Sequence, residues 1–194
     1  MRPFSSNAIS PLPDGVVHPP EPLLPSRPLG LSVVLFLTVF ALLQWGWSEA
    51  RGTWIERLIV DRMTVKTAAA VIATLDPATG VQAVGSRLKA DGGGINILNG
   101  CEGIEVLFLL AGALLVAPLV WRMRLLGLVA GGGLVFVLNQ VRVIALFYAF
   151  RSDRALFDTL HGVIAPLLLI LATGAFFVVW LDRHGPRREL AAGE

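Results

Sequence analysis

Four long apolar runs stand out in the pattern of hydrophobic and polar positions along the chain. Each is about 18 residues long or more, which is enough helix to cross a hydrocarbon core of about 30 Å. The runs cover residues 29–47, 104–121, 125–150 and 161–181. The pattern predicts an all-α integral membrane protein whose membrane domain, residues 29–182, is a bundle of four transmembrane helices.

Arginines near the ends of these runs predict how the helices are oriented. Residues 121–124, with Arg122 and Arg124, connect the second and third runs so tightly that the two helices form an antiparallel hairpin with a cytoplasmic turn. The basic tail of residues 183–194 carries three more arginines. We therefore expect a multi-pass protein of the cell membrane, the inner membrane where there are two, with both termini in the cytoplasm.

The first 28 residues have a composition unlike the rest of the chain. They hold eight of the twelve prolines and few large apolar residues, which predicts a disordered cytoplasmic tail. The first apolar run begins too far from residue 1 for a cleaved signal peptide, and no small-residue cleavage pattern follows it. We therefore interpret that run as an uncleaved signal anchor.

The segment between the first two runs, residues 49–100, is expected on the outer side of the membrane. Within residues 53–63 the apolar positions recur at helical spacing, which predicts an amphipathic helix along the outer interface, where tryptophan is favoured. These positions are Trp54, Ile55, Leu58, Ile59 and Met63. Asp76-Pro77 ends the helical stretch, because the residue before a proline avoids the helical region. Residues 81–98 alternate weakly between glycine breaks, which indicates a short β-hairpin or an ordered loop.

The composition agrees with a membrane protein and excludes several other classes. The 194 residues are 55% hydrophobic and only 15% charged, with a mean hydropathy of +0.70, whereas soluble domains carry about 25% charged residues. The net charge of +2 comes from arginines at the ends of apolar runs rather than on one basic face, so we expect no nucleic-acid partner. The sequence has no Cys/His cluster with metal-ligand spacing, no Gly-rich nucleotide loop and no Gly-x-Ser-x-Gly motif, so no metal or cofactor is expected.

The chain has a single cysteine, Cys101, in the stretch Asn99-Gly100-Cys101-Glu102-Gly103 just before the second apolar run. One cysteine cannot form an intramolecular disulfide, so Cys101 is either an inert small hydrophobic residue, the commoner case, or a nucleophile. The flanking glycines let the backbone bend and other groups approach closely. Glu105, four residues further on, is a candidate supporting residue.

Three polar residues, Asn139, Gln140 and Arg142, lie inside the third apolar run. An arginine within a membrane helix costs at least about 2.5 kcal/mol on insertion scales, and this cost requires a reason. Arg142 either extends its side chain to the surface or serves a site inside the bundle, which the shared helix face of Asn139 and Arg142 favours. On the same helix Gly127 and Gly131, with the glycines at 132 and 133, predict close packing against a neighbouring helix.

His161 begins the fourth run, at the same expected outer depth as Cys101 and Arg142. Taken alone it is a half-buried polar residue at an interface, but a cysteine, a histidine and an arginine in one partly dry site are what acyl transfer to a thiol needs. The nucleophile is the thiolate of Cys101, and the pKa of a thiol falls beside a cation and at a helix N-terminus. His161 is the candidate general acid and base. Arg142 can stabilise an oxyanion, and Asn139 can orient either partner.

These residues resemble those of the exosortase/archaeosortase family of membrane-embedded cysteine transpeptidases, especially its short forms. Residues 99–103 are similar to the family's Cys-x-Gly motif, residues 139–143 (Asn-Gln-Val-Arg-Val) to its Asn-x-x-Arg motif, and His161 to its histidine motif. The chain departs from the family at Glu102, where many members have serine, and at Ala165-Pro166, where glycine is frequent, and many members have more spans. The resemblance covers roughly residues 95–182.

The resemblance implies an enzyme that cleaves C-terminal sorting signals, made of a short motif, a membrane helix and a basic tail, at the outer face of the membrane. The enzyme then transfers the new carboxyl end to an acceptor. By resemblance its catalytic residues are Cys101, Arg142 and His161, and its partners are sorting-signal proteins, the lipid bilayer and the exopolysaccharide machinery. Two other interpretations stay open: a non-catalytic scaffold or assembly subunit in exopolysaccharide export, and a transporter fragment with Arg142 on an anion path.

Overall fold

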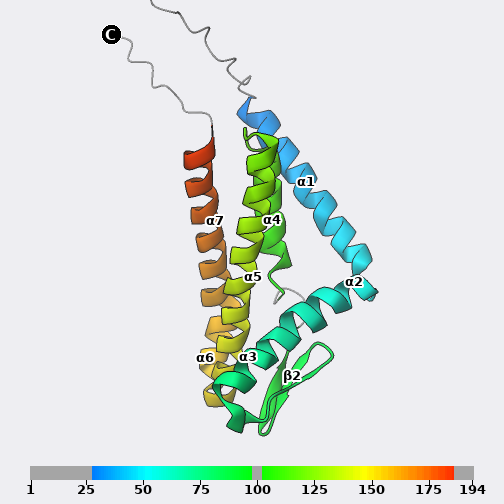
Figure 1. Cartoon of the computed structure of the whole chain (residues 1–194), viewed down its shortest axis with the longest axis vertical. Coiled ribbons are helices and arrows are strands. Elements are labelled where there is room, and N and C mark those ends of the chain that lie inside the picture. The colour runs from blue at the N-terminus through cyan, green and yellow to red at the C-terminus, as the bar shows by residue number, and fades with distance from the viewer. Residues whose placement is uncertain (1–27, 98–101, 186–194) are drawn as a thin grey trace, which may run out of the picture.

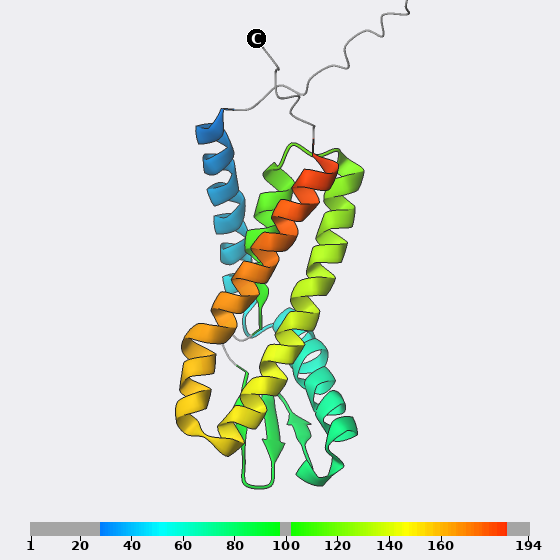
Figure 2. The ribbon, with the colours of Figure 1, turned by 90° about the vertical axis from the view of Figure 1, so that its left-hand side faces the viewer.

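The computed structural model describes residues 28–97 and 102–185, which form an elongated helical bundle with a cap at one end (Figure 1). Four helices run side by side along the bundle (Figures 1 and 2). They are α1 (Leu29–Ala50), α4 (Ile104–Val116), α5 (Trp121–Ser152) and α7 (Ala165–His184). The start of α1 and the end of α7 lie at the end of the bundle opposite the cap.

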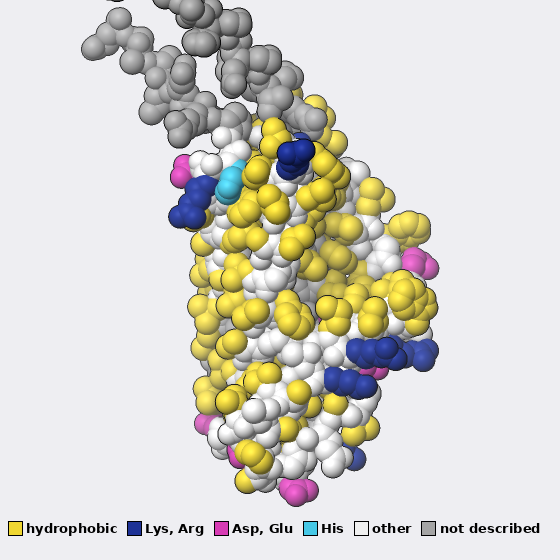
Figure 3. All heavy atoms as spheres, viewed as in Figure 1, with side chains coloured by type: hydrophobic (Ala, Val, Ile, Leu, Met, Phe, Trp, Pro, Cys, Tyr) yellow, Lys and Arg dark blue, Asp and Glu magenta, His cyan; other side chains and the backbone are white. Residues whose placement is uncertain are grey.

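Three of the described helices are long and apolar enough to cross a membrane. They are α1, α5 and the helix Arg154–His184, which joins α6 (Arg154–Thr159), the π-helical turn η3 (Leu160–Ile164) and α7. Large apolar side chains are exposed along much of α1 and α7, and Figure 3 shows hydrophobic side chains spread over the bundle on one side of the molecule. The prediction of a mainly helical protein is confirmed, and the three long apolar helices with their exposed apolar surface are compatible with a membrane protein.

Helix α4 is shorter than the predicted second span of residues 104–121. It has 13 residues and ends at Val116, so it is about 20 Å long. It is therefore shorter than the three helices that are long enough to cross a membrane. Pro118 is the physical reason, because a proline disfavours helical backbone in the residue before it, and Ala117 has ψ 146°. In place of the predicted four spans, the described residues contain three long apolar helices and one short one.

The connection between α4 and α5 also differs from the prediction. Residues 121–124 are the first turn of α5 rather than a loop, and residues 117–120 make the turn. Arg124 Nη2 donates a hydrogen bond to the carbonyl oxygen of Ala117 at 3.0 Å, which ties the turn to the start of α5. The two helices pack against each other, so the predicted antiparallel hairpin is confirmed.

The last long helix begins before the predicted residue 161. Only Asp153 separates α5 from α6, and its side-chain Oδ1 accepts a hydrogen bond from the backbone N–H of Ala155 at 2.8 Å, an N-cap that starts the new helix. Pro166 has no N–H to donate to the preceding turn, which accounts for the π-helical widening just before it. His161 therefore lies in a π-helical turn within the helix and does not begin it.

The cap contains one continuous helix of residues 54–75, which we call the cap helix. It consists of α2 (Trp54–Arg57), the π-helical segment η1 (Leu58–Lys66) and α3 (Thr67–Leu75). Its start is capped by Thr53 Oγ1, which accepts a hydrogen bond from the N–H of Ile55 at 3.2 Å. It ends before Asp76, whose φ of −143° leaves the helix one residue ahead of Pro77, and the short helix η2 (Pro77–Thr79) follows. The helix predicted over residues 53–63 is confirmed, and so is the end of the helical stretch that follows it at Asp76-Pro77.

The cap helix does not pack through the apolar positions that define its predicted face. Trp54, Ile55, Leu58 and Met63 are exposed, and Ile59 is half-buried. The residues that the cap helix buries are Val60, Thr64, Val65, Ala68, Ala69 and Ile72. The helix therefore has a second apolar side that faces away from the protein.

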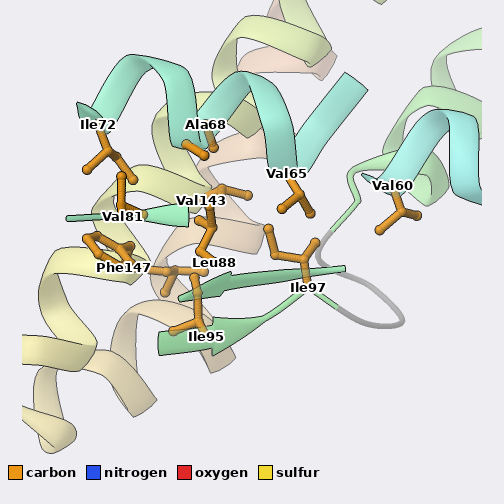
Figure 4. Close-up of a cluster of buried hydrophobic side chains, with 12 residues drawn as sticks. Val60, Val65, Ala68, Ile72, Val81, Leu88, Ile95, Ile97, Val143 and Phe147 are labelled. Carbon is orange, nitrogen blue, oxygen red and sulfur yellow. The ribbon is translucent and has the colours of Figure 1, made fainter. Parts of the chain in front are cut away.

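A three-stranded antiparallel sheet follows the cap helix, where the sequence indicated a hairpin or a loop. Its strands are β1 (Gln82–Val84), β2 (Arg87–Ala90) and β3 (Gly93–Asn96), in the order β1-β2-β3. Gln82 pairs with Lys89, and Arg87 pairs with Asn96. The turns use Gly85 and Gly92, whose φ values of 57° and 85° favour glycine. The sheet lies against the cap helix and the end of α5 that packs in the cap (Figure 4).

Buried apolar side chains form two separate clusters. The cap core joins the cap helix, the sheet and α5, and its largest fully buried side chains include Phe147, Ile72, Leu88 and Ile97 (Figure 4). The bundle core is built on Leu110, Leu114, Ala117, Leu119 and Val135. Gly127 and Gly131 face Trp180 and Phe176 of α7 at distances that leave no room for a Cβ, as the glycine pattern predicts, whereas Gly133 faces open space.

Candidate functional site: a buried polar layer on α5

Helix α5 passes through both cores and carries a layer of polar side chains between them. Val135 belongs to the bundle core and Val143 to the cap core. Between them Asn139, Gln140 and Arg142 are only 2%, 7% and 8% exposed. Burying three such side chains is costly unless each is satisfied, so this layer is where the structure departs most from a simple apolar bundle.

The polar layer lies one hydrocarbon thickness from the opposite end of the bundle. Twenty residues of continuous helix separate Arg122 from Arg142, which corresponds to about 30 Å at 1.5 Å per residue. The other part of α5, from Val143 to Ser152, packs in the cap. Arg142 therefore falls at the boundary between the apolar bundle and the cap.

Asn139 lies against the start of α4. Gly103 is the N-cap of α4 and has the left-handed values φ 74° and ψ 4°. A Cβ atom at this position would be 3.0 Å from both Cγ and Oδ1 of Asn139. The buried Oδ1 of Asn139 has no hydrogen-bond partner among the described residues. The contact brings the last residue of the Cys-x-Gly stretch onto the polar layer.

Gln140 ties the cap helix to α5. Its Nε2 donates a hydrogen bond to the backbone carbonyl oxygen of Met63 at 3.2 Å. Met63 lies in the π-helical segment η1, where the hydroxyl of Thr64 in turn donates to the carbonyl oxygen of Ile59 at 3.0 Å. π-Helical turns occur often at functional sites. The sequence marks Gln140 as a polar residue in an apolar run. Its acceptor, the backbone oxygen of Met63, lies 77 positions away in the chain and cannot be predicted from the sequence pattern.

Arg142 is buried on the same side of α5 as Asn139, as their spacing predicts. A side chain that extends along the helix to water would leave its guanidinium exposed, and Arg142 is only 8% exposed. The interpretation that Arg142 merely reaches the surface is therefore wrong.

His161 lies at the protein surface rather than in the polar layer. Its ring stacks on Phe157 with 5.5 Å between centroids and 3° between planes, and Phe157 packs edge-on against Phe150 of α5. His161 stands 23 residues before His184, about 34 Å along the helix, which is close to the level of Arg142 on α5. Helix α5 also contacts η3 directly. The structure thus brings His161 to the level of the polar layer but leaves its side chain exposed.

The remaining predicted site residues lie at or near the start of α4. Cys101 is outside the described residues, as are Asn99 and Gly100. Glu105 is exposed in the first turn of α4, where a carboxylate is favourable for the helix dipole. Glu102 is half-buried and lines a polar hollow of about 280 Å³ between the cap helix and the β1–β2 turn. The other residues that line this hollow are Glu56, Arg57, Val60, Asp61, Gly85, Ser86 and Ile97.

In the part of the chain that the structure describes, no group of three or more His, Cys, Asp or Glu residues is placed to hold a metal ion. Comparisons with protein-family models, with curated proteins and with solved structures found no match to this chain.

Proposed function

We propose that the protein is a membrane-embedded cysteine protease and transpeptidase of the exosortase type, which cleaves C-terminal sorting signals and transfers the new carboxyl end to an acceptor. The observation that carries this proposal is the buried polar layer of Asn139, Gln140 and Arg142 between two apolar cores. Placing an arginine inside a membrane helix costs at least about 2.5 kcal/mol of insertion free energy, so a buried arginine there indicates a functional role.

Cys101 is the proposed nucleophile. It precedes Gly103 by two residues, so covalent geometry limits the separation of their Cα atoms to about 7 Å. Gly103 itself packs on Asn139, one helical turn from Arg142. The short covalent link from Cys101 to Gly103 and the contact of Gly103 with Asn139 support the proposal that the Cys101 thiol can reach the polar layer.

The chemistry needs only groups that the chain carries. The Cys101 thiolate attacks the carbonyl carbon of the scissile peptide bond, and Arg142 stabilises the negative oxygen that develops. The carbon–nitrogen bond breaks, the amine leaves with a proton from His161, and a thioester remains on Cys101. The nucleophilic group of an acceptor then gives its proton to His161, attacks the thioester and releases the thiolate. An exposed His161 can approach a substrate that arrives from the bilayer.

The depth of the polar layer suits a substrate that is itself a membrane helix. A sorting signal with a basic tail in the cytoplasm and a helix across the bilayer presents its preceding motif at the outer interface. We propose that the cap, with the loop of residues 49–100, faces outside, and that the end of the bundle with Arg122 and Arg124 faces the cytoplasm. Reporter fusions at Ser86 and after Arg124 test this orientation, and a cytoplasmic signal from the Ser86 fusion contradicts it.

Processing of a co-expressed sorting-signal protein tests the proposed function. We expect Cys101→Ala and His161→Ala to abolish processing while the protein stays inserted in the membrane at the same level. His184→Ala is the matched control, because His184 lies at the other end of the same helix, where its ring packs against Trp180. Full processing by Cys101→Ala would contradict the proposal. If deletion of the protein stops exopolysaccharide export but Cys101→Ala does not, the scaffold alternative is favoured.

A further inference from the structure

The outward side of the cap helix combines exposed apolar side chains with basic ones. Trp54, Leu58 and Met63 are 70%, 38% and 47% exposed. Arg57, Arg62 and Lys66 are exposed on the same stretch of helix. We call these six residues the outward face. Figure 3 shows basic side chains grouped directly beside an apolar area where the cap helix crosses the molecule.

The carboxylates of the same helix point elsewhere. Glu56 and Asp61 are half-buried and line the polar hollow toward the sheet, and the exposed Arg57 lines the same hollow beside them. Glu56 is also held by a hydrogen bond that its Oε2 accepts from the backbone N–H of Gly52 at 2.6 Å. Glu49 at the end of α1 is the nearest exposed carboxylate along the chain. Arg62 and Lys66 are exposed and do not line the hollow, so the outward face is positively charged.

Two anchors fix the depth of this face. The cap helix starts four residues after α1 ends, and α1 has 22 residues, or about 33 Å of helix. The hydrogen bond from Gln140 to the Met63 carbonyl attaches the middle of the cap helix to the polar layer. Both anchors lie about one hydrocarbon thickness from the far end of the bundle, so the outward face meets the headgroup region of a bilayer that surrounds the bundle.

We propose that the outward face of the cap helix is a binding surface for anionic phospholipid headgroups. Arginine binds phosphate through its fork of donors, and Lys66 adds a point charge beside it. Tryptophan is favoured at headgroup level, while Leu58 and Met63 enter the boundary of the acyl chains. Three cations within ten residues favour anionic over zwitterionic lipid, because each basic residue near the surface adds attraction to negative headgroups. This surface is independent of any thiol chemistry.

Nitroxide-lipid quenching in nanodiscs tests this surface on the full chain. An NBD fluorophore is attached at Met63→Cys in a Cys101→Ser background, and the same label at Gln82→Cys on the exposed strand β1 is the control position. The probes are phosphatidylglycerol and phosphatidylcholine, each with a nitroxide near the headgroup end of the acyl chain. At equal mole fraction we expect the phosphatidylglycerol probe to quench the label at residue 63 about twofold more strongly, with little quenching at residue 82.

Charge removal identifies the source of the preference. The variant Arg57→Gln/Arg62→Gln/Lys66→Gln should make the two lipid probes quench equally, whereas Arg87→Gln/Lys89→Gln on the sheet should leave the preference unchanged. Equal quenching by both probes in the parent protein overturns the proposal and leaves only neutral contact with the interface. Absence of quenching at residue 63 overturns it as well, and is the result expected if a protein partner covers the face.

Discussion

Gly103 at the start of α4 lies directly against the side chain of Asn139 on α5, so a Cβ atom added to Gly103 would be 3.0 Å from the Asn139 amide carbon. Gly103 also has a φ of 74°, a conformation that glycine adopts readily and other residues do not. Both requirements fall on the last residue of the Cys-x-Gly stretch. The close approach of α4 and α5 at the polar layer therefore depends on a glycine at this position.

Gly103→Ala should disturb the site through both strain and contact. Left-handed backbone costs roughly 1–2 kcal/mol for a residue with a Cβ, and the clash with Asn139 adds to it. Gly92→Ala is the matched control, because Gly92 has a φ of 85° but no atom within 4 Å of the added Cβ. We expect thermal unfolding in detergent to show a larger loss of Tm for Gly103→Ala than for Gly92→Ala. Equal losses would mean that the contact with Asn139 contributes nothing.

Gln140→Leu should loosen the middle of the cap helix. The substitution keeps the volume but removes the donor to the Met63 carbonyl, which costs about 1–3 kcal/mol when the acceptor stays buried. Hydrogen–deuterium exchange should then be about tenfold faster or more in residues 58–66. Val141→Leu is the control, because Val141 is 59% exposed and should not change exchange there. Unchanged exchange in Gln140→Leu would show that this hydrogen bond does not hold the cap helix.

Arg142→Lys distinguishes a role of the guanidinium fork from a role of positive charge alone. If two parallel donors hold the substrate oxygen, lysine should be almost as damaging to processing as Arg142→Ala, because lysine is a point charge that can deprotonate when buried. Arg87→Ala, at an exposed position on β2, should process normally. Full activity of Arg142→Lys would mean that charge alone suffices and that the fork geometry is irrelevant.

The features that the sequence predicts well are those that depend on local pattern. The apolar runs, the start of the helix at Thr53 and its end before Pro77 all follow from periodicity and backbone preference. The burial of Asn139 and Arg142 on one side of α5 follows from their spacing. Pro118 also carried a local signal for the early end of α4, but the apolar run continues past it to Trp121.

The features that the sequence does not predict depend on tertiary contact. The cap helix has two apolar sides, and only packing against β2 and α5 decides that Val65 and Ile72 are buried while Trp54 and Leu58 stay exposed. The bond from Gln140 to Met63 joins distant segments, and its acceptor is a backbone atom with no residue preference. The sequence predicts a helix start at His161 because residues 151–159 are rich in polar residues and read as a loop, whereas in the structure Asp153 caps a helix that begins at Arg154.

The reactivity of the single thiol tests the central claim most directly, because it needs no known substrate. A membrane-impermeant alkylating reagent is applied from outside to the wild type and to Arg142→Ala, from about pH 6 to pH 9. If Cys101 lies outside and beside Arg142, removing the cation raises the pKa of the thiol, so alkylation should be slower in Arg142→Ala near neutral pH and the two rates should converge as pH rises. Equal rates across this range, or labelling only from the cytoplasmic side, would contradict the proposed site.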